Sequence, residues 1–236
     1  MITLKRLQGI DIFRGWAISL MILFHLFFDL DHFSYIDIEI KSDTFWISFR
    51  LLIVSMFLIT VGMSLKLAHK TAINWKRIKK RVFLLASASL LVTIGSYMQF
   101  PQSWIYFGVL HFVLLSSLIA LPFLNYPKLS VSLAMFILIG YALNYLHMTW
   151  LFELLVQPLQ LPKEHTEDII RFIPWFSPIL LGSAMVTLNW HTKLFNHDFF
   201  NRKSSLNSSF SFLGRNSLLI YLIHQPILFA LFFLLQ

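Results

Sequence analysis

The chain has 236 residues, of which 57% are hydrophobic and only 13% are charged. A soluble domain carries about 25% charged residues, so this composition excludes an ordinary soluble protein and predicts an integral membrane protein. Cysteine is absent, which excludes disulfides, thiolate catalysis and cysteine metal sites. The net charge of +8 does not require a nucleic-acid partner, because the basic residues lie between apolar segments and fit membrane orientation better.

Seven apolar segments are long enough to cross a membrane as helices, since a spanning helix needs about 20 mostly apolar residues. In chain order they are 12–30, 44–66, 81–99, 103–123, 129–148, 169–189 and 214–235. The stretch 150–162 is shorter and contains Glu153 and two prolines, which favours an interfacial or re-entrant position. No internal repeat or long linker is visible. We therefore predict one all-α domain over 1–236, a polytopic transmembrane helix bundle.

Basic residues are concentrated on one side of this predicted topology. That side comprises the N-terminus, the connections 67–80, 124–128 and 190–213, and the adjoining ends of the spans. It holds 15 of the 19 Lys and Arg residues but only two of the 11 acidic residues. Because cytoplasmic loops carry an excess of Lys and Arg, this side is predicted to be cytoplasmic. The N-terminus is then in the cytoplasm and the C-terminus is outside.

The first span carries a stripe of ionisable residues. An α-helix turns about 100° per residue, so four of them fall within roughly 60° of one another: Asp11, Arg14, His25 and Asp29. An ionisable residue inside a bilayer is costly and is a functional-site hypothesis by default. His25 and Asp29, one turn apart, offer a base and an acid for proton transfer.

Five ionisable groups on four predicted spans share the outer half of the bilayer: His25, Asp29, Arg50, His111 and Arg171. Charges in lipid are paired or expelled, so these groups are expected to face one another in a cavity. Arg50 and Arg171 have an alternative, because a long basic side chain can snorkel to the outer headgroups. His111 could equally be a satisfied structural residue.

Two further residues accompany this group. Trp175 lies beside Arg171 at the outer start of the sixth span. His224 lies near the middle of the seventh span and is followed by Pro226, which is expected to kink that helix. His224 is a candidate site residue, with a hydrogen bond to a neighbouring helix as the alternative.

Three arginines stand at the predicted cytoplasmic mouths of spans: Arg14, Arg81 and Arg215. A charged nucleotide could dock there without entering lipid, and Asn216 and Ser217 add hydrogen-bond donors at the same level. The alternative is a topology signal that contacts lipid phosphates. No H-x-x-x-H or H-E-x-x-H motif occurs, so no metal site is predicted.

Four stretches occur in one order along the chain: LQGIDIFRGWAISLMILFH, FRLLIVSMFLITVGMSL, RFIPWFSPILLGSAM and FLGRNSLLIYLIHQPIL. Together they resemble bacterial members of the heparan-alpha-glucosaminide N-acetyltransferase catalytic-domain family, within the broader membrane acyltransferase superfamily. The resemblance implies an acyltransferase of the bacterial cytoplasmic (inner) membrane. It implies transfer of an acyl group, in particular acetyl, from cytoplasmic acyl-CoA (acetyl-CoA) to a sugar or glycan acceptor on the outer side.

Such chemistry needs a general base and donors that stabilise an oxyanion. His25 is the expected base, oriented by Asp29. His32 competes with it, because the resemblance places a histidine linked to catalysis just after the first helix in the lysosomal branch. The remaining residues expected to bind substrate are Arg50, His111, Arg171, Trp175 and His224. Those expected to bind acyl-CoA are Arg14, Arg81, Arg215, Asn216 and Ser217.

Two other functions fit the same polar cavity. One is a small proton-coupled transporter or flippase, although the inverted repeats common in transporters are not visible. The other is a non-catalytic membrane subunit, in which His25, Asp29 and His32 are all replaceable. The expected partners are the lipid bilayer, acyl-CoA and the acceptor, without nucleic acid, and a homodimer is compatible with the sequence. Direct transfer and an acyl-histidine intermediate both remain open.

Overall fold

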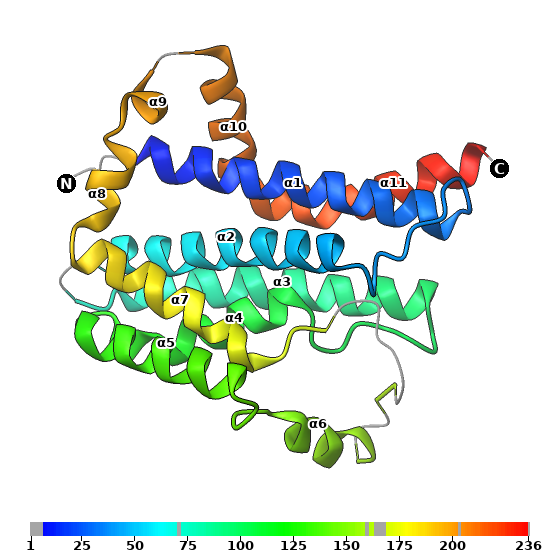
Figure 1. Cartoon of the computed structure of the whole chain (residues 1–236), viewed down its shortest axis with the longest axis horizontal. Coiled ribbons are helices and arrows are strands. Elements are labelled where there is room, and N and C mark those ends of the chain that lie inside the picture. The colour runs from blue at the N-terminus through cyan, green and yellow to red at the C-terminus, as the bar shows by residue number, and fades with distance from the viewer. Residues whose placement is uncertain (1–6, 70–71, 159–160, 163–168, 203, 236) are drawn as a thin grey trace. The chain divides into compact units, whose positions relative to one another are not determined.

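The computed structural model describes residues 7–69, 72–158, 161–162, 169–202 and 204–235. Within these ranges every regular element is a helix, in agreement with the all-α prediction (Figure 1). The helices are α1 (Gln8–His32), α2 (Thr44–Ala68), α3 (Trp75–Gln99), α4 (Val109–Ile119), the short 3₁₀ helix η1 (Leu121–Phe123), α5 (Pro127–Ala142), α6 (Thr149–Val156), α7 (Phe172–Thr187), α8 (Trp190–Phe195), α9 (Asp198–Asn201), α10 (Ser205–Arg215) and α11 (Ser217–Leu235).

Seven of these helices overlap the seven predicted spans. Among the described residues, four are long and apolar enough to cross a membrane, namely α1, α2, α3 and α11. The other three, α4, α5 and α7, are apolar but have 11, 16 and 16 residues. At 1.5 Å per residue they advance about 16–24 Å, less than the roughly 30 Å of a bilayer core. The protein is therefore an integral membrane protein, and the count of seven spans stays a prediction.

The predicted connection 190–213 is helical instead of irregular, because it contains α8, α9 and most of α10. Ser204 begins α10 as its N-cap by accepting a hydrogen bond from the backbone N–H of Asn207 at 3.1 Å. The buried face of α10 is small and polar, with Asn207, Ser211 and Gly214. Sequence reasoning missed this helix because it has no long apolar run.

The chain divides into two compact units. The first consists of Met1–Thr60 and Trp190–Gln236, and the second of Val61–Asn189. The first therefore contains α1, most of α2 and α8–α11. The second contains the end of α2, then α3–α7. The predicted site residues are distributed over both units.

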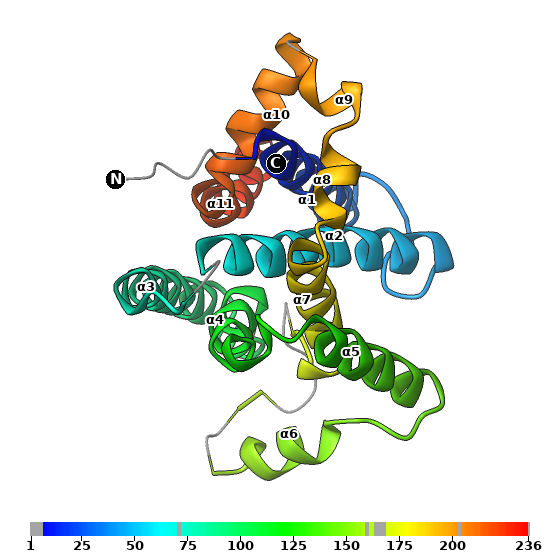
Figure 2. The same cartoon turned by 90° about the vertical axis from the view of Figure 1, so that its left-hand side faces the viewer.

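In the first unit, α10 crosses α1 near its N-terminal end, and α11 then runs beside α1 in the same direction (Figures 1 and 2). The residue numbers of the contact pairs increase along both segments, as expected for parallel packing. The pairs are Arg14 with Gly214, His25 with His224, Asp29 with Gln225, and Phe33 with Phe232. If α1 and α11 both cross the bilayer, parallel packing requires an odd number of crossings between them. Because α2 and α3 supply two, an odd number of the shorter apolar helices must cross as well. The seven-span prediction meets this condition.

Glycine permits a close approach where α10 runs across α1 (Figure 2). A Cβ at Gly15 would overlap the carbonyl oxygen of Phe210, and one at Gly214 would overlap the carbonyl oxygen of Asp11. The two backbones therefore touch reciprocally, which only residues without a side chain allow. This contact fixes the α10–α11 segment at the N-terminal end of α1.

The second unit is built on the packing of α5 against α7 and of α3 against α4. Its largest fully buried side chains include Phe112, Ile179 and Leu180. Gly62, near the end of α2, lies against the carbonyl oxygen of Ile179 in another close approach. Buried apolar surface and backbone contact thus hold these shorter helices together.

Candidate functional site

His25 lies in the C-terminal half of α1, and its ring is half-buried. Its Nδ1 is 2.9 Å from the carbonyl oxygen of Met21, one turn earlier. A carbonyl oxygen can only accept, so Nδ1 carries the proton, and the neutral ring then presents Nε2 as an acceptor. The Met21 carbonyl, rather than Asp29, therefore fixes the tautomer of His25. An unprotonated Nε2 is what a general base requires.

The ring of His224 on α11 stands edge-on to the ring of His25, with centroids 4.8 Å apart. His224 is buried, at 8% exposed. Its Nδ1 is 2.7 Å from the carbonyl oxygen of Tyr221, so the same argument assigns the proton to Nδ1 and an acceptor lone pair to Nε2. The structure thus brings together two of the predicted histidines in equivalent tautomers.

Asp29 is fully buried, and its Oδ1 accepts a hydrogen bond of 2.8 Å from Nε2 of Gln225 on α11. Sequence reasoning missed Gln225. The available signal was an amide in a strongly apolar helix, next to a histidine. His25, Asp29, His224 and Gln225, which we call the His–Asp cluster, therefore lie together between α1 and α11.

His32, the competing base, is the last residue of α1 and is exposed. Its ring packs against Phe33 and Phe229, with centroids 5.2 and 5.6 Å away. It lies close enough to Asp29 to interact electrostatically. His32 is thus at the rim of the cluster, whereas His25 is within it.

Arg14 lies at the other end of α1 and ties three helices together. Its Nη1 donates to Asp11 Oδ1 at 3.3 Å and to the carbonyl oxygen of Gly214 at 3.2 Å. Its Nε donates to the hydroxyl of Thr60 on α2 at 3.4 Å. His25 lies eleven positions after Arg14, a rise of about 16 Å. The predicted stripe is therefore two groups at different depths.

The remaining residues predicted to bind acyl-CoA in the first unit lie near Arg14. Arg215 is exposed, with Nε donating to the carbonyl oxygen of Ser211 at 3.2 Å. Asn216 follows it, with Nδ2 donating to the carbonyl oxygen of Phe212 at 2.9 Å, and Ser217 begins α11. These groups cluster where α10 meets α11.

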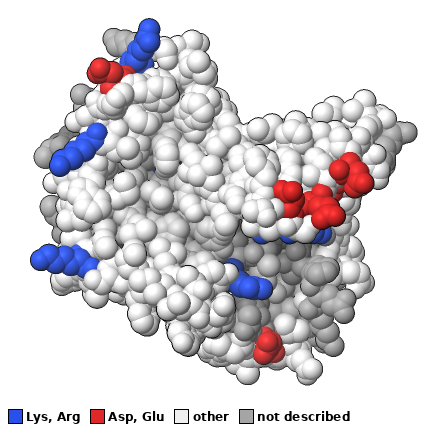
Figure 3. Space-filling model, in the orientation of Figure 1, with Lys and Arg blue, Asp and Glu red and all other residues white. Residues whose placement is uncertain are grey.

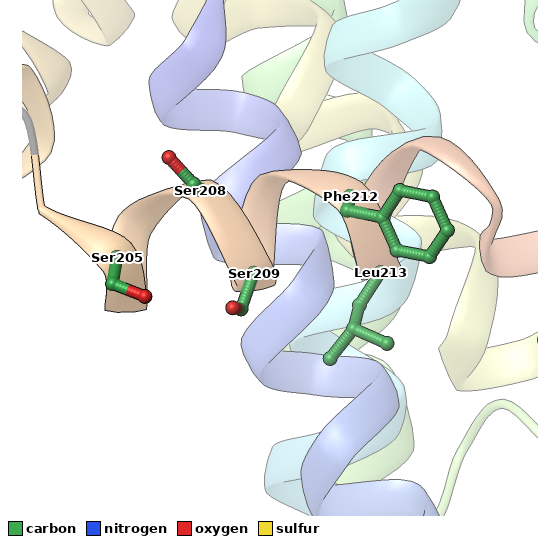
Figure 4. Close-up of a pocket in the computed structure, with 5 residues that line it drawn as sticks. All are labelled: Ser205, Ser208, Ser209, Phe212 and Leu213. Atoms are coloured by element: carbon green, nitrogen blue, oxygen red, sulfur yellow. The ribbon is translucent and has the colours of Figure 1, made fainter.

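Surface features differ between the two ends of α1. A hollow on α10 is lined by Ser205, Ser208, Ser209, Phe212 and Leu213 (Figure 4). A second hollow is lined by Asp31 in the last turn of α1 and by Ser34, Tyr35, Ile36 and Asp37 of the following loop. Acidic side chains gather on a patch at this end (Figure 3), where the sequence contains Asp31, Asp37, Glu39 and Asp43. The α8–α10 end instead has the exposed cations Lys193, Arg202 and Arg215.

Arg50 is exposed on α2, in the first unit. The other predicted site residues belong to the second unit, so their meeting with the His–Asp cluster stays a prediction. His111 is half-buried on α4, with Nε2 3.1 Å from the Thr93 hydroxyl. Arg81 Nε donates to the Ser117 hydroxyl at 3.2 Å. Arg171 is the exposed N-cap of α7, and Trp175 is half-buried in its first turn.

A buried histidine that was not predicted, His69, follows α2. Its Nδ1 accepts a hydrogen bond of 3.1 Å from the backbone N–H of Asn74, the N-cap of α3. Burial lowers the pKa of His69 below 6.5, and the nearby cations Arg77, Arg81 and Lys66 lower it further. This contact joins His69, after the end of α2, to the N-cap of α3.

Among the described residues, no group of three or more His, Asp or Glu side chains could hold a metal ion.

A comparison with protein families gives one match that covers nearly the whole chain. The family described as "Heparan-alpha-glucosaminide N-acetyltransferase, catalytic" matches residues 6–226. No curated protein and no solved structure matches. The chain belongs to this family.

Proposed function

We propose that this member of the heparan-alpha-glucosaminide N-acetyltransferase catalytic family transfers an acetyl group from acetyl-CoA to an amino or hydroxyl group of a sugar or glycan. The donor enters from the cytoplasmic side, and the acceptor binds on the outer side. His25 acts as the general base. Asp29, His224 and the rim residue His32 surround the acceptor.

The contact between His25 Nδ1 and the carbonyl oxygen of Met21 is the observation that carries this proposal. Its Nδ1–H is engaged by the Met21 carbonyl at 2.9 Å, which leaves Nε2 as the proton acceptor. The base thus lies within a membrane-length helix beside a fully buried carboxyl group. Such groups in a membrane segment are costly and typically serve a function.

The reaction balances with His25 alone as the proton carrier. Nε2 takes the proton from the acceptor N–H or O–H as the nitrogen or oxygen attacks the thioester carbonyl. Collapse of the tetrahedral intermediate breaks the C–S bond, and the proton passes from His25 to the departing CoA sulfur. The products are the acetylated acceptor and CoA thiol.

Donor binding is proposed at the α10 end of the first unit. Arg215, Asn216 and Ser217 lie there with the exposed cations of α8–α10, which suits the phosphates of CoA. Arg14 supports this end through its contacts to α2 and α10. Arg81 is also proposed to bind the donor. Arg50, His111, Arg171 and Trp175 are proposed to bind the acceptor or stabilise the oxyanion.

The test is CoA release by the purified full-length protein with labelled acetyl-CoA and a panel of amino-sugar and glycan acceptors. His25→Ala is expected to lower the rate by about 10²- to 10⁴-fold, because a general base contributes that much. His32→Ala, at the rim, is expected to lower the rate less than His25→Ala, and the exposed His147→Ala is the matched control that keeps the wild-type rate. Loss of activity in His32→Ala alone would assign the base to His32.

The same assay separates the competing functions. Absence of CoA release with every acceptor would contradict the enzyme proposal. Movement of a sugar across vesicles without CoA release would favour the transporter. Normal activity of a partner protein in the presence of His25→Ala, Asp29→Ala and His32→Ala chains would indicate a non-catalytic subunit.

A further inference from the structure

Three buried side-chain atoms of the His–Asp cluster have no hydrogen-bond partner among the described residues. They are Asp29 Oδ2, His224 Nε2 and Gln225 Oε1. Asp29 is 0% exposed and His224 is 8% exposed, so water does not reach them freely. A buried polar atom without a partner costs about 1–3 kcal/mol. Three such atoms on facing stretches of two helices indicate a place prepared for a ligand.

Each of these side chains has its other polar atom engaged within the protein. Asp29 Oδ1 accepts from Gln225 Nε2 at 2.8 Å, and His224 Nδ1 lies 2.7 Å from the Tyr221 carbonyl oxygen. The carboxyl oxygen and the carbonyl oxygen accept, so Nε2 of Gln225 and Nδ1 of His224 are the donors. Oε1 of Gln225 and Nε2 of His224 are consequently acceptors, and Oδ2 of Asp29 is a third acceptor in the ionised carboxylate.

We propose that Gln225 is a positioning residue for Asp29, and that Asp29 Oδ2, His224 Nε2 and Gln225 Oε1 form one acceptor-only subsite that binds an N–H- or O–H-bearing group. Identifying this group as part of the acyl acceptor rests on the proposed function. The subsite holds the group beside His25, whose ring stands edge-on to the ring of His224 at a centroid distance of 4.8 Å. An oxyanion needs donors, so this subsite binds the nucleophile and the oxyanion is stabilised elsewhere.

The ligand-free protein provides the first test. Nitrogen-15 NMR of the full chain with labelled histidine, in lipid nanodiscs, reports which ring nitrogen of His224 carries the proton. The ring signals of His224 are identified by their loss in the His224→Asn variant. The ring signals of the exposed His147 serve as the reference for a solvent-accessible histidine. The expected result is a protonated Nδ1 and an unprotonated Nε2. A protonated Nε2 would overturn the acceptor-only subsite.

The second test addresses the positioning role. The infrared carboxyl band of Asp29, identified by its loss in Asp29→Asn, is compared in the wild type, Gln225→Met and Gln99→Met. Gln99 is exposed at the end of α3, so it provides the same chemical change without the contact. The band is expected to shift in Gln225→Met only. An unshifted band would overturn the positioning role, and Gln225→Leu, which also removes the amide donor, makes the same test if Gln225→Met does not fold.

The third test uses small probes without acetyl-CoA, so it is independent of acyl transfer. Methylammonium and glycerol carry donors, whereas tetramethylammonium has the charge of methylammonium but no N–H group. Methylammonium, glycerol or both are expected to shift the His224 Nε2 resonance, and tetramethylammonium is not. Gln225→Met is expected to weaken the effective probe about tenfold. A response to neither donor probe, or an equal response to tetramethylammonium, would overturn the subsite even if CoA release is observed.

Discussion

The two ends of α1 hold buried polar groups in opposite conditions. At the N-terminal end, Arg14 donates to Asp11, Thr60 and Gly214, so its charge is compensated within the protein. Toward the C-terminal end, Asp29 has one oxygen engaged and one without a partner among the described residues. The same helix therefore carries a satisfied ionic group and an unsatisfied one about 22 Å further along its axis.

In a membrane helix, a polar group with all its partners and one that lacks a partner are expected to have different roles. A satisfied ionic contact stabilises the arrangement of helices, and its removal is expected to affect folding. An unsatisfied buried carboxyl group destabilises the protein and is retained where a ligand completes it. Arg14 is accordingly expected to matter for stability, and Asp29 for activity.

The largest expected effect concerns the glycine contact that positions the Arg14 end. Gly214→Leu places a side chain against the backbone of Asp11, so α10 must move away from α1. We expect a loss of more than about 3 kcal/mol of unfolding free energy, measured by thermal or denaturant unfolding in detergent.

Gly95→Ala is the matched control for this substitution. Nothing lies within 4 Å of a Cβ at Gly95 in α3. Alanine favours a helix over glycine by about 1 kcal/mol, so this variant is expected to be as stable as the wild type or more stable. Equal stability of Gly214→Leu and Gly95→Ala would show that the close approach of α10 to α1 does not stabilise the protein.

Arg14→Met tests the satisfied end directly. It leaves Asp11, which is 4% exposed, without its cation, and we expect destabilisation of about 2 kcal/mol. Asp11→Asn combined with Arg14→Met is expected to recover part of this loss. The control is Arg215→Met, because Arg215 is exposed and its replacement is expected to change stability by less than about 0.5 kcal/mol. An equal loss of stability in Arg14→Met and Arg215→Met would contradict a stabilising role for the contacts of Arg14.

The smallest effect is expected from His69, a satisfied group in the second unit. Its pKa is lowered by burial first and by nearby cations second, so folding favours the neutral ring. This contribution is complete above pH 6.5 and is lost as the pH falls from 6.5 through the folded-state pKa. His69→Gln keeps an acceptor without titrating. Unfolding midpoints across this range should fall less in His69→Gln, and parallel curves would count against the assignment.

The sequence predicted the helical class and the polar stripe because both follow from local periodicity. Asp11, Arg14, His25 and Asp29 do lie on one helix, α1. Periodicity could not identify the partners that α11 brings, so Gln225 was missed. Gln225 is neutral, and its importance depends on parallel packing of segments nearly 200 residues apart. The helices in 190–213 were missed because α10 buries a small polar face rather than an apolar one.

Asp29→Asn tests the central claim most directly, with stability and CoA release measured on one preparation. Asparagine keeps the size of the side chain and an oxygen that accepts from Gln225. We expect this variant to unfold at a temperature equal to or above that of the wild type and to transfer acetyl about 100-fold more slowly. A destabilised Asp29→Asn protein with the wild-type rate of transfer would contradict a role of Asp29 in the reaction. Asp29 would then serve the stability of the protein, as is expected of Arg14.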